Sequence, residues 1–391
     1  MFELMRACLV VSCLVWGFPM AVAVGAEKDN AEYRVYVGTY TDGDSEGIYR
    51  LALDRSTGRL TRQGVVSGVT NPSFLAIHPN RRFLYAVNEV GKFRGKSSGA
   101  VSAFAIDGKT GDLKFLNQHP SGGAAPCHLV VNRSGSHVLV ANYTGGSVAS
   151  LPIAKDGRLA PAVSFIQHTG SSVLDRQQGP HAHSINLDDQ NRYAVVADLG
   201  LDQVLVYQFD SGTGRLTANT PPSTTVVAGA GPRHFDFHPN HRYAYVINEI
   251  NLTINAFAYD ARRGVLKQLQ TVRTLPAGVE NTGSTADVQV HPSGRFLYGS
   301  NRGHDSIVVF AIDQNTGKLT YVEHESTGGR TPRNFGLDPA GEFLLAANQS
   351  TNSIVVFRID PRSGALTPTG HQSNVPSPVC IKMISSVPAS R

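Results

Sequence analysis

A pattern of fifteen residues occurs six times along the chain, and it restricts the possible folds more than any other feature. Each copy contains an apolar run, a polar turn with Pro, Gly or Asn, a second apolar run rich in Tyr, Val and Ala, and a last residue that is usually polar. Two short strands joined by a tight turn give this pattern. The copies are Leu75–Glu89, Leu129–Tyr143, Ile185–Leu199, Phe235–Glu249, Val288–Arg302 and Phe335–Gln349.

Each copy is followed by two more strand-like runs, joined by a turn of the form Asp-x-x-Thr/Ser-Gly-x-Leu, as in residues 107–113. Four strands in about 50 residues is the period of a propeller blade. A seventh unit is split: residues 33–41 match the second strand, and residues 375–381 resemble residues 71–77, which begin a first strand. We therefore expect an all-β, seven-bladed β-propeller with four antiparallel strands per blade. The C-terminal strand should join blade 1 and close the ring.

The N-terminal residues have the features of a secretory leader. Arg6 precedes the apolar stretch Ala7–Val24, and small residues follow it. This arrangement predicts a signal peptide over residues 1–26, cleaved after Ala23 or Ala26. A membrane anchor is the alternative, but the stretch is interrupted by glycine and proline and is close to the minimum length for a span.

The remaining sequence, residues 33–383, forms the expected propeller domain. We expect it to be exported, periplasmic or extracellular, with no stable membrane insertion after cleavage. Its Cys127 and Cys380 belong to blades that are not adjacent, so both should be free thiols. The net charge is +5, and no Lys/Arg run is interleaved with aromatic residues, which argues against nucleic acid as a partner. A small anionic ligand suits the mild positive charge better.

The repeat brings two sets of residues to one mouth of the central channel. The first strand of a blade runs along the channel and the second returns, so the start of one and the end of the other share a face. The copies differ most at these positions, as expected for a site carried on a common scaffold. The first set is Ser73, Cys127, His183, Arg233, Ala286, Arg333 and Ser377, and the second is Glu89, Tyr143, Leu199, Glu249, Arg302 and Gln349. The His-Pro turns of His78, His238 and His291 should lie on the far face and be structural.

Three of these residues, Arg233, Arg302 and Arg333, are arginines. Planar guanidinium groups suit carboxylate or phosphate, and their field should lower the pKa of Glu249 or stabilise an oxyanion. Three arginines would also repel a divalent cation, so we expect a site without a metal. The alternative is a network of inter-blade salt bridges in which Glu249 is only a partner of the arginines.

His181 and His183 form a His-Ala-His sequence whose side chains should point the same way in a strand. They could be catalytic or substrate-binding, or hydrogen-bonded structural residues, or a zinc pair that needs a third ligand. His304 is close to the mouth and could assist. Cys127 has no evident base beside it, so we expect an inert thiol. The expected substrate-binding residues are His181, Arg333, Glu89, Tyr143, His304 and Gln349.

Five long motifs resemble the seven-bladed propeller lactonase family, which contains bacterial 6-phosphogluconolactonases and fungal carboxy-muconate lactonizing enzymes. They lie at residues 179–184, 196–207, 229–242, 300–313 and 328–341, and the resemblance covers about residues 33–383. It implies lactone chemistry with neither a metal nor an organic cofactor. It also implies a His, two Arg and a Glu as catalytic residues, which match His183, Arg233, Glu249 and Arg302.

The first hypothesis is therefore a 6-phosphogluconolactonase-like lactone hydrolase that opens an anionic sugar lactone to the aldonic acid. Arg233, Arg302 and Arg333 would hold the anionic end and stabilise the oxyanion, and His183 or Glu249 would act as general base. A muconate-type lactonizing isomerase is one alternative. A non-enzymatic secreted propeller that binds a sugar acid or a partner protein is another.

Overall fold

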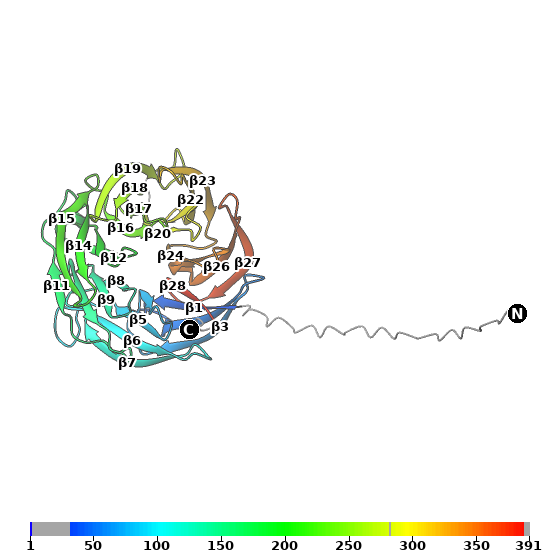
Figure 1. Cartoon of the computed structure of the whole chain (residues 1–391), viewed down its shortest axis with the longest axis horizontal. Helices are drawn as coiled ribbons and strands as arrows, with labels where there is room; N and C mark the ends of the chain where they lie inside the picture. The colour runs from blue at the N-terminus through cyan, green and yellow to red at the C-terminus, as the bar shows by residue number, and fades with distance from the viewer. Residues whose placement is uncertain (2–31, 281–282, 387–391) are drawn as a thin grey trace.

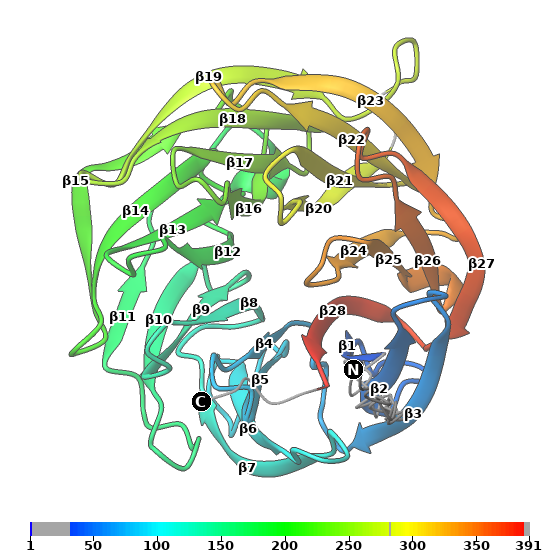
Figure 2. The same ribbon diagram turned by 45° about the vertical axis from the view of Figure 1, so that its right-hand side comes forward.

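The computed structural model describes residue 1 and residues 32–280 and 283–386. These residues form seven four-stranded antiparallel sheets arranged around a central axis (Figures 1 and 2). The seven-bladed β-propeller is thus confirmed. The predicted signal peptide, apart from its first residue, lies outside the described residues. Within the described part of the chain, no helix has the length and apolar character needed to cross a membrane.

The strands fall into four classes by their distance from the axis. The innermost strands are β4 (Leu75–Ile77), β8 (Pro126–Val131), β12 (Ala182–Leu187), β16 (Pro232–Phe237), β20 (Ser284–Val290), β24 (Pro332–Leu337) and β28 (Pro378–Ser385). The second strands are β1 (Glu32–Thr39), β5 (Phe83–Asn88), β9 (His137–Asn142), β13 (Tyr193–Asp198), β17 (Tyr243–Asn248), β21 (Phe296–Arg302) and β25 (Phe343–Asn348).

The third and fourth strands complete each blade toward the outside. The third strands are β2 (Gly47–Asp54), β6 (Ala100–Ile106), β10 (Ser147–Pro152), β14 (Gln203–Asp210), β18 (Thr253–Asp260), β22 (Ser306–Ile312) and β26 (Ser353–Ile359). The fourth are β3 (Leu60–Ser67), β7 (Leu113–Pro120), β11 (Ser164–Gln167), β15 (Arg215–Thr225), β19 (Val265–Arg273), β23 (Leu319–Ser326) and β27 (Leu366–Asn374). Two short 3₁₀ helices, η1 (Asp175–Gln177) and η2 (Gln349–Thr351), lie in connections.

The ring closes as expected, because β28 pairs antiparallel with β1 (Figure 2). The register expected for this strand, however, is wrong by two residues. Val379, not Ser377, takes the channel position of blade 1. The expected register placed Pro376 directly before the channel position. In the structure Pro378 precedes the bulge of this strand, as Pro232 does in blade 5.

Most of the turns between third and fourth strands owe their shape to an aspartate at their start. In the turn at Asp107, the carboxylate Oδ1 accepts hydrogen bonds from the backbone N–H groups of Lys109 and Thr110, at 2.9 and 2.8 Å. Gly111 then takes a φ of 77°, which glycine adopts without steric cost. The same interactions recur at Asp210, Asp313 and Asp360.

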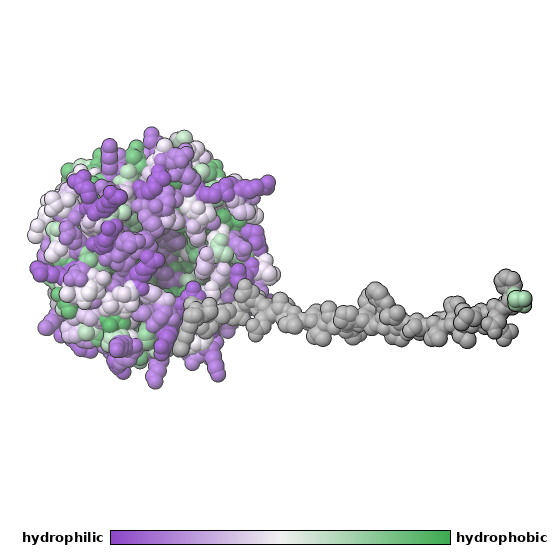
Figure 3. All heavy atoms as spheres, viewed as in Figure 1, coloured by the Kyte–Doolittle hydropathy of each residue, from purple (hydrophilic) through white to green (hydrophobic). Residues whose placement is uncertain are grey.

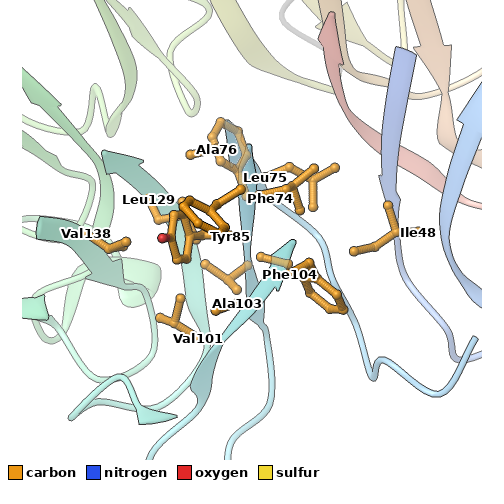
Figure 4. Close-up of a cluster of buried hydrophobic side chains, with 14 of the residues drawn as sticks. Ile48, Phe74, Leu75, Ala76, Tyr85, Val101, Ala103, Phe104, Leu129 and Val138 are labelled. Atoms are coloured by element: carbon orange, nitrogen blue, oxygen red, sulfur yellow. The ribbon is translucent and has the colours of Figure 1, made fainter. Parts of the chain in front are cut away.

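Apolar side chains fill the spaces between blades, and polar groups fix the blades to one another (Figure 4). Tyr245 on β17 is buried and donates its hydroxyl to the carbonyl of Gly317 in the next blade, at 3.0 Å. Tyr85 and Tyr298 make equivalent bonds. On the far face His78, His238 and His291 each contact a glycine carbonyl of the next blade's turn. The structural role expected for these histidines is consistent with those bonds.

We predict that Tyr245→Phe lowers the melting temperature by a few degrees. The substitution leaves a buried carbonyl without its partner, which costs about 1–3 kcal/mol. Calorimetry of the variant beside Tyr321→Phe, whose parent side chain is exposed, measures the effect. An unchanged Tm would show that this inter-blade bond contributes nothing.

Buried asparagines at the ends of the second strands fix the mouth of the channel. Four of them donate Nδ2 to a carbonyl of the connection that enters the same blade; the pairs are Asn88–Thr70, Asn142–Ser121, Asn301–Thr274 and Asn348–Thr327. In blade 5, Asn248 donates instead to Thr253 Oγ1 and Asn255 Oδ1. In blade 4, Asp198 stands in place of the asparagine and His168 in place of the connection's carbonyl. Asp198 Oδ2 lies 2.6 Å from His168 Nδ1. The residue that follows each of these positions is thereby held at the rim.

Candidate active site

A small hollow lies on the axis, at the mouth end of the inner strands. It is lined by Tyr40, Ser73, Phe74, Glu89, Cys127, His183, Arg233, His234, Arg333 and Val379. Five of these are in the channel set expected from the repeat. Figure 3 shows the opposite face of the ring, on which the inner strands end, with mostly hydrophilic residues around the axis.

Consecutive residues reach this hollow because the inner strands bulge at their mouth ends. In blade 5 the pairing of β16 with β17 shifts between Pro232 and His234. The extra residue breaks the two-residue alternation, so Arg233 and His234 both line the hollow. Five other blades have a shift at the same point.

Glu249, at the end of β17, is the centre of a cluster of three arginines. Its Oε2 lies 2.7 Å from Arg233 Nε and 3.1 Å from an Arg302 terminal nitrogen. Its Oε1 lies 2.5 Å from a terminal nitrogen of Arg176. His183 Nε2 is 4.0 Å from Oε2. The four expected catalytic residues are therefore brought together, although Glu249 and Arg302 stand behind the lining of the hollow.

This arrangement fixes the ionisation of Glu249. Burial alone would raise the pKa of the carboxyl, but Arg302, Arg233 and Arg176 outweigh it and lower the pKa to about 2. Its oxygens are also occupied by guanidinium groups, so Glu249 is a weak candidate for a general base. The inter-blade salt bridges weighed as an alternative do exist, since Arg302 belongs to blade 6 and Glu249 to blade 5.

A second cluster lies on the other side of the axis, where blades 7, 1 and 2 meet. A terminal nitrogen of Arg333 donates to the Tyr40 hydroxyl at 3.0 Å, and that hydroxyl donates to Glu89 Oε2 at 2.9 Å. Ser73 Oγ donates to the same oxygen at 2.5 Å. Among the described residues, Arg333 has no other protein acceptor, so its remaining N–H groups are available to an anion in the hollow.

His183 is buried in the wall of the hollow with 4% of its surface exposed. Burial, together with Arg233, lowers the pKa of His183 well below its usual value, so the imidazole is neutral at pH 7. Cys127 Sγ lies 3.3 Å from the His183 carbonyl, and burial raises the pKa of the Cys127 thiol. Cys127 and Cys380 are both free, as expected.

His181 stands outside the hollow, at its rim. Its ring stacks on Tyr143 with 4.6 Å between centroids, and Tyr143 also contacts His183 edge-on at 5.3 Å. The Tyr143 hydroxyl accepts a hydrogen bond from Arg176 at 3.1 Å. In the described residues, no group of three or more His, Cys, Asp or Glu side chains is placed to hold a metal ion.

Four of the six expected substrate-binding residues are not among those that line the hollow: His181 and Tyr143, described above, and His304 and Gln349. His304 lies in the turn between β21 and β22, where its Nδ1 is 2.7 Å from Ser306 Oγ and its ring contacts His324. Gln349 begins η2, and its backbone N–H donates to the Thr331 carbonyl. Both stand at the mouth face but away from the two charged clusters.

Comparison with known proteins places the chain in a family. A family model for the seven-bladed β-propeller lactonases matches residues 34–383. The chain belongs to the seven-bladed β-propeller lactonase family. A 6-phosphogluconolactonase of Bacillus subtilis is 38% identical over 356 residues, covering 91% of this chain and 99% of the relative. A second, from Formosa agariphila, is 36% identical over 309 residues, covering 78% and 86%.

A solved lactonase structure has the same fold over nearly its full length. The periplasmic gluconolactonase of Pseudomonas aeruginosa matches with a TM-score of 0.86 and 35% sequence identity, covering 91% of this chain and 99% of that one. The family membership stated from the sequence motifs is thereby confirmed.

Three residues of this lactonase-family site were missed from the sequence. Arg176 lies in the long connection between β11 and β12, outside the fifteen-residue pattern. Tyr40 ends the second strand of the split blade, so the alignment of residues 33–41 could have identified it. His234 follows Arg233 and was overlooked because strict alternation would turn it away from the channel.

Proposed function

We propose that this protein hydrolyses the lactone of an anionic sugar acid, with no metal or organic cofactor in the reaction. The observation that carries the proposal is the hollow itself, in which cationic Arg233 and Arg333 and neutral imidazoles face one small space. Four arginines and two glutamates in the two clusters leave two positive charges in excess. That excess suits a substrate with a phosphate or carboxylate group.

The chemistry follows from what each group can donate or accept. Water attacks the lactone carbonyl while an imidazole accepts its proton. The carbonyl oxygen becomes an oxyanion that guanidinium N–H groups stabilise in a site shielded from water. The bond between the carbonyl carbon and the ring oxygen then breaks, and the imidazolium returns the proton to that oxygen. Water has been added and the product is the open-chain hydroxy acid.

The direct test is hydrolysis by the purified protein of 6-phosphogluconolactone, gluconolactone and a neutral aliphatic lactone, each corrected for spontaneous ring opening. We expect the phosphorylated or carboxylated substrates to be opened fastest. The absence of acceleration with every lactone would refute the proposal. Ring closure of a muconate-type acid without uptake of water would instead support the lactonizing isomerase.

Arg333→Ala should separate anion binding from chemistry. This side chain makes one protein hydrogen bond and lines the hollow, so its loss should leave the fold intact. We expect KM for 6-phosphogluconolactone to rise about tenfold or more, from the loss of a charge-assisted contact, while KM for gluconolactone stays nearly constant. Equal changes for the two substrates would mean that Arg333 does not bind the anionic group.

The pH dependence should differ from that of an ordinary histidine. Burial is the main cause that lowers the pKa of both His183 and His234, to about 4 for His234. A base must be unprotonated, so a lowered pKa moves the loss of activity to lower pH. We expect kcat/KM to be nearly constant from pH 7.5 down to about 5.5. A fall centred near pH 6.5 would contradict this.

We further propose that the enzyme acts outside the cytoplasm. The apolar leader expected over residues 1–26 and the periplasmic name of the Pseudomonas aeruginosa relative support this. Expression of the full chain in a Gram-negative host, followed by fractionation and N-terminal sequencing, tests it. A cytoplasmic product that retains Met1 would refute the proposal.

A further inference from the structure

His234 occupies a place on the floor of the hollow that the proposed reaction has not yet used. Its side chain is 7% exposed. Its ring meets those of His183 and His128 edge-on, each at 5.4 Å, and that of Phe74 at 5.8 Å. The His234 ring is therefore in direct contact with the ring of His183, the histidine already expected to be catalytic.

A buried carboxylate orients the His234 imidazole. Asp287 Oδ1 lies 2.6 Å from His234 Nδ1. The carboxylate is itself held by the backbone N–H of Val288 at 2.9 Å, by Gln289 Nε2 at 2.9 Å and by Asn334 Nδ2 at 2.6 Å. Burial acts to raise the pKa of Asp287, but His234, Gln289 and Lys382 lower it, so the carboxyl stays ionised. An ionised Asp287 accepts a hydrogen bond from the Nδ1–H group of His234, which leaves the Nε2 lone pair free.

Three other blades show that this contact is not part of the common scaffold. At the equivalent position of the inner strand, the side chain accepts a hydrogen bond from a backbone N–H of the next blade. The accepting atoms are His128 Nδ1, Asn334 Oδ1 and Cys380 Sγ. His234 instead contacts the side chain of Asp287. Among the described residues, no group forms a hydrogen bond with His234 Nε2, and the ring lines the hollow.

His183 lacks this support. Its Nδ1 lies 3.7 Å from the Cys127 thiol, and its Nε2 lies 4.0 Å from a Glu249 carboxylate that three arginines already occupy. In the part of the chain that the structure describes, no carboxylate lies within hydrogen-bond distance of His183 to select its tautomer. A general base needs an unprotonated nitrogen aimed at the substrate and a group that fixes its orientation. Of these two histidines, His234 meets both requirements.

We propose that His234, oriented by Asp287, is the general base of the lactone hydrolysis, with His183 binding the substrate. The proposal rests on the proposed function. His234 Nε2 takes a proton from the attacking water as the water oxygen bonds to the lactone carbonyl carbon. When the bond from that carbon to the ring oxygen breaks, the imidazolium gives the proton to the ring oxygen. Asp287 remains ionised throughout and is a positioning residue.

The charges around His234 are compatible with this role. Burial and the adjacent Arg233 lower its pKa, Asp287 raises it, and Lys382 lowers it further. An anionic lactone bound beside Arg233 would offset the guanidinium charge and so raise the basicity of the imidazole when substrate is present.

The kinetic test compares His234→Gln, Asp287→Asn and His183→Gln on 6-phosphogluconolactone and gluconolactone. We expect the first two to lower kcat by about 10²–10⁴-fold, with the double variant no worse than His234→Gln. His183→Gln should mainly raise KM. Asp338→Asn is the matched control: it alters an equally buried carboxylate at the far face and should leave kcat unchanged. Thermal melts confirm that each variant is folded.

Two further measurements distinguish a catalytic pair from a structural one. Imidazole added to His234→Ala should restore part of the lost rate, which a structural role would not allow. ¹⁵N NMR should show the Nδ1–H tautomer for His234 in the wild-type protein and the other tautomer in Asp287→Asn.

The outcomes separate the two proposals. A wild-type protein that opens lactones, together with a His234→Gln variant that keeps its kcat, would overturn only the role of His234. The Nε2–H tautomer in the wild-type protein would do the same. A wild-type protein without activity on any lactone would refute the proposed function, and the role of His234 with it.

Discussion

Arg233→Ala is expected to lower kcat/KM for a lactone about 10³-fold, the largest effect on activity among the four arginines of the two clusters. Arg233 is the only residue that both lines the hollow and bonds directly to Glu249 among the residues that the structure describes. Its Nε binds Glu249, and a terminal nitrogen donates to the Ala286 carbonyl at 2.5 Å, so the guanidinium plane is fixed before substrate arrives. A fixed donor stabilises an oxyanion without reorganisation.

The same variant should remain folded. Glu249 keeps Arg302 and Arg176, so its charge is still compensated, and we expect Tm to fall by only a few degrees. Arg295→Ala is the control, because Arg295 donates to two carbonyls of the next blade on the far face. Loss of activity in both variants, or an unfolded Arg233→Ala protein, would assign Arg233 to the scaffold.

The architecture followed from the sequence because packing repeats wherever the blades repeat. Tyr85, Tyr245 and Tyr298 occupy the same place in their copies and make the same inter-blade bond. The aspartate turns are equally regular. A periodic pattern therefore predicts the number of blades, the strands in each and the closing strand.

The site was predicted only where it obeys the repeat. His183, Arg233, Glu249 and Arg302 meet because each stands at a position set by strand register. Arg176 reaches Glu249 from the connection between β11 and β12, which lies outside the fifteen-residue pattern, so strand register does not place its side chain.

Local backbone geometry explains the other failures. A bulge at the mouth end of the inner strands brings His234 beside Arg233, and alternation of side chains cannot predict it. In blade 1 the inner strand begins at Pro378, two residues after the proline used for the expected register. The channel position is therefore occupied by Val379 and not by Ser377. Both errors arise at the point where the strands leave regular pairing, which is also where the site is built.

Glu249→Gln should produce the largest loss of stability. The side chain is 3% exposed and is the carboxylate that Arg233, Arg302 and Arg176 share. Without its charge, three guanidinium groups face one another with no compensation. Removal of one partner from a buried ion pair costs about 3–5 kcal/mol, which corresponds to roughly 5–10 °C in Tm.

The dependence of this loss on pH identifies its origin. The pKa of Glu249 is lowered to about 2 in the folded protein from 4.5, so its contribution is present above pH 4.5 and disappears as the pH falls toward 2. The difference in Tm between wild type and Glu249→Gln should therefore be largest near neutral pH and shrink on acidification. Glu342→Gln, at an exposed site, should show no difference at any pH. A difference that stays constant from pH 7 to pH 3 would mean that packing of the side chain, not its charge, stabilises the mouth of the propeller.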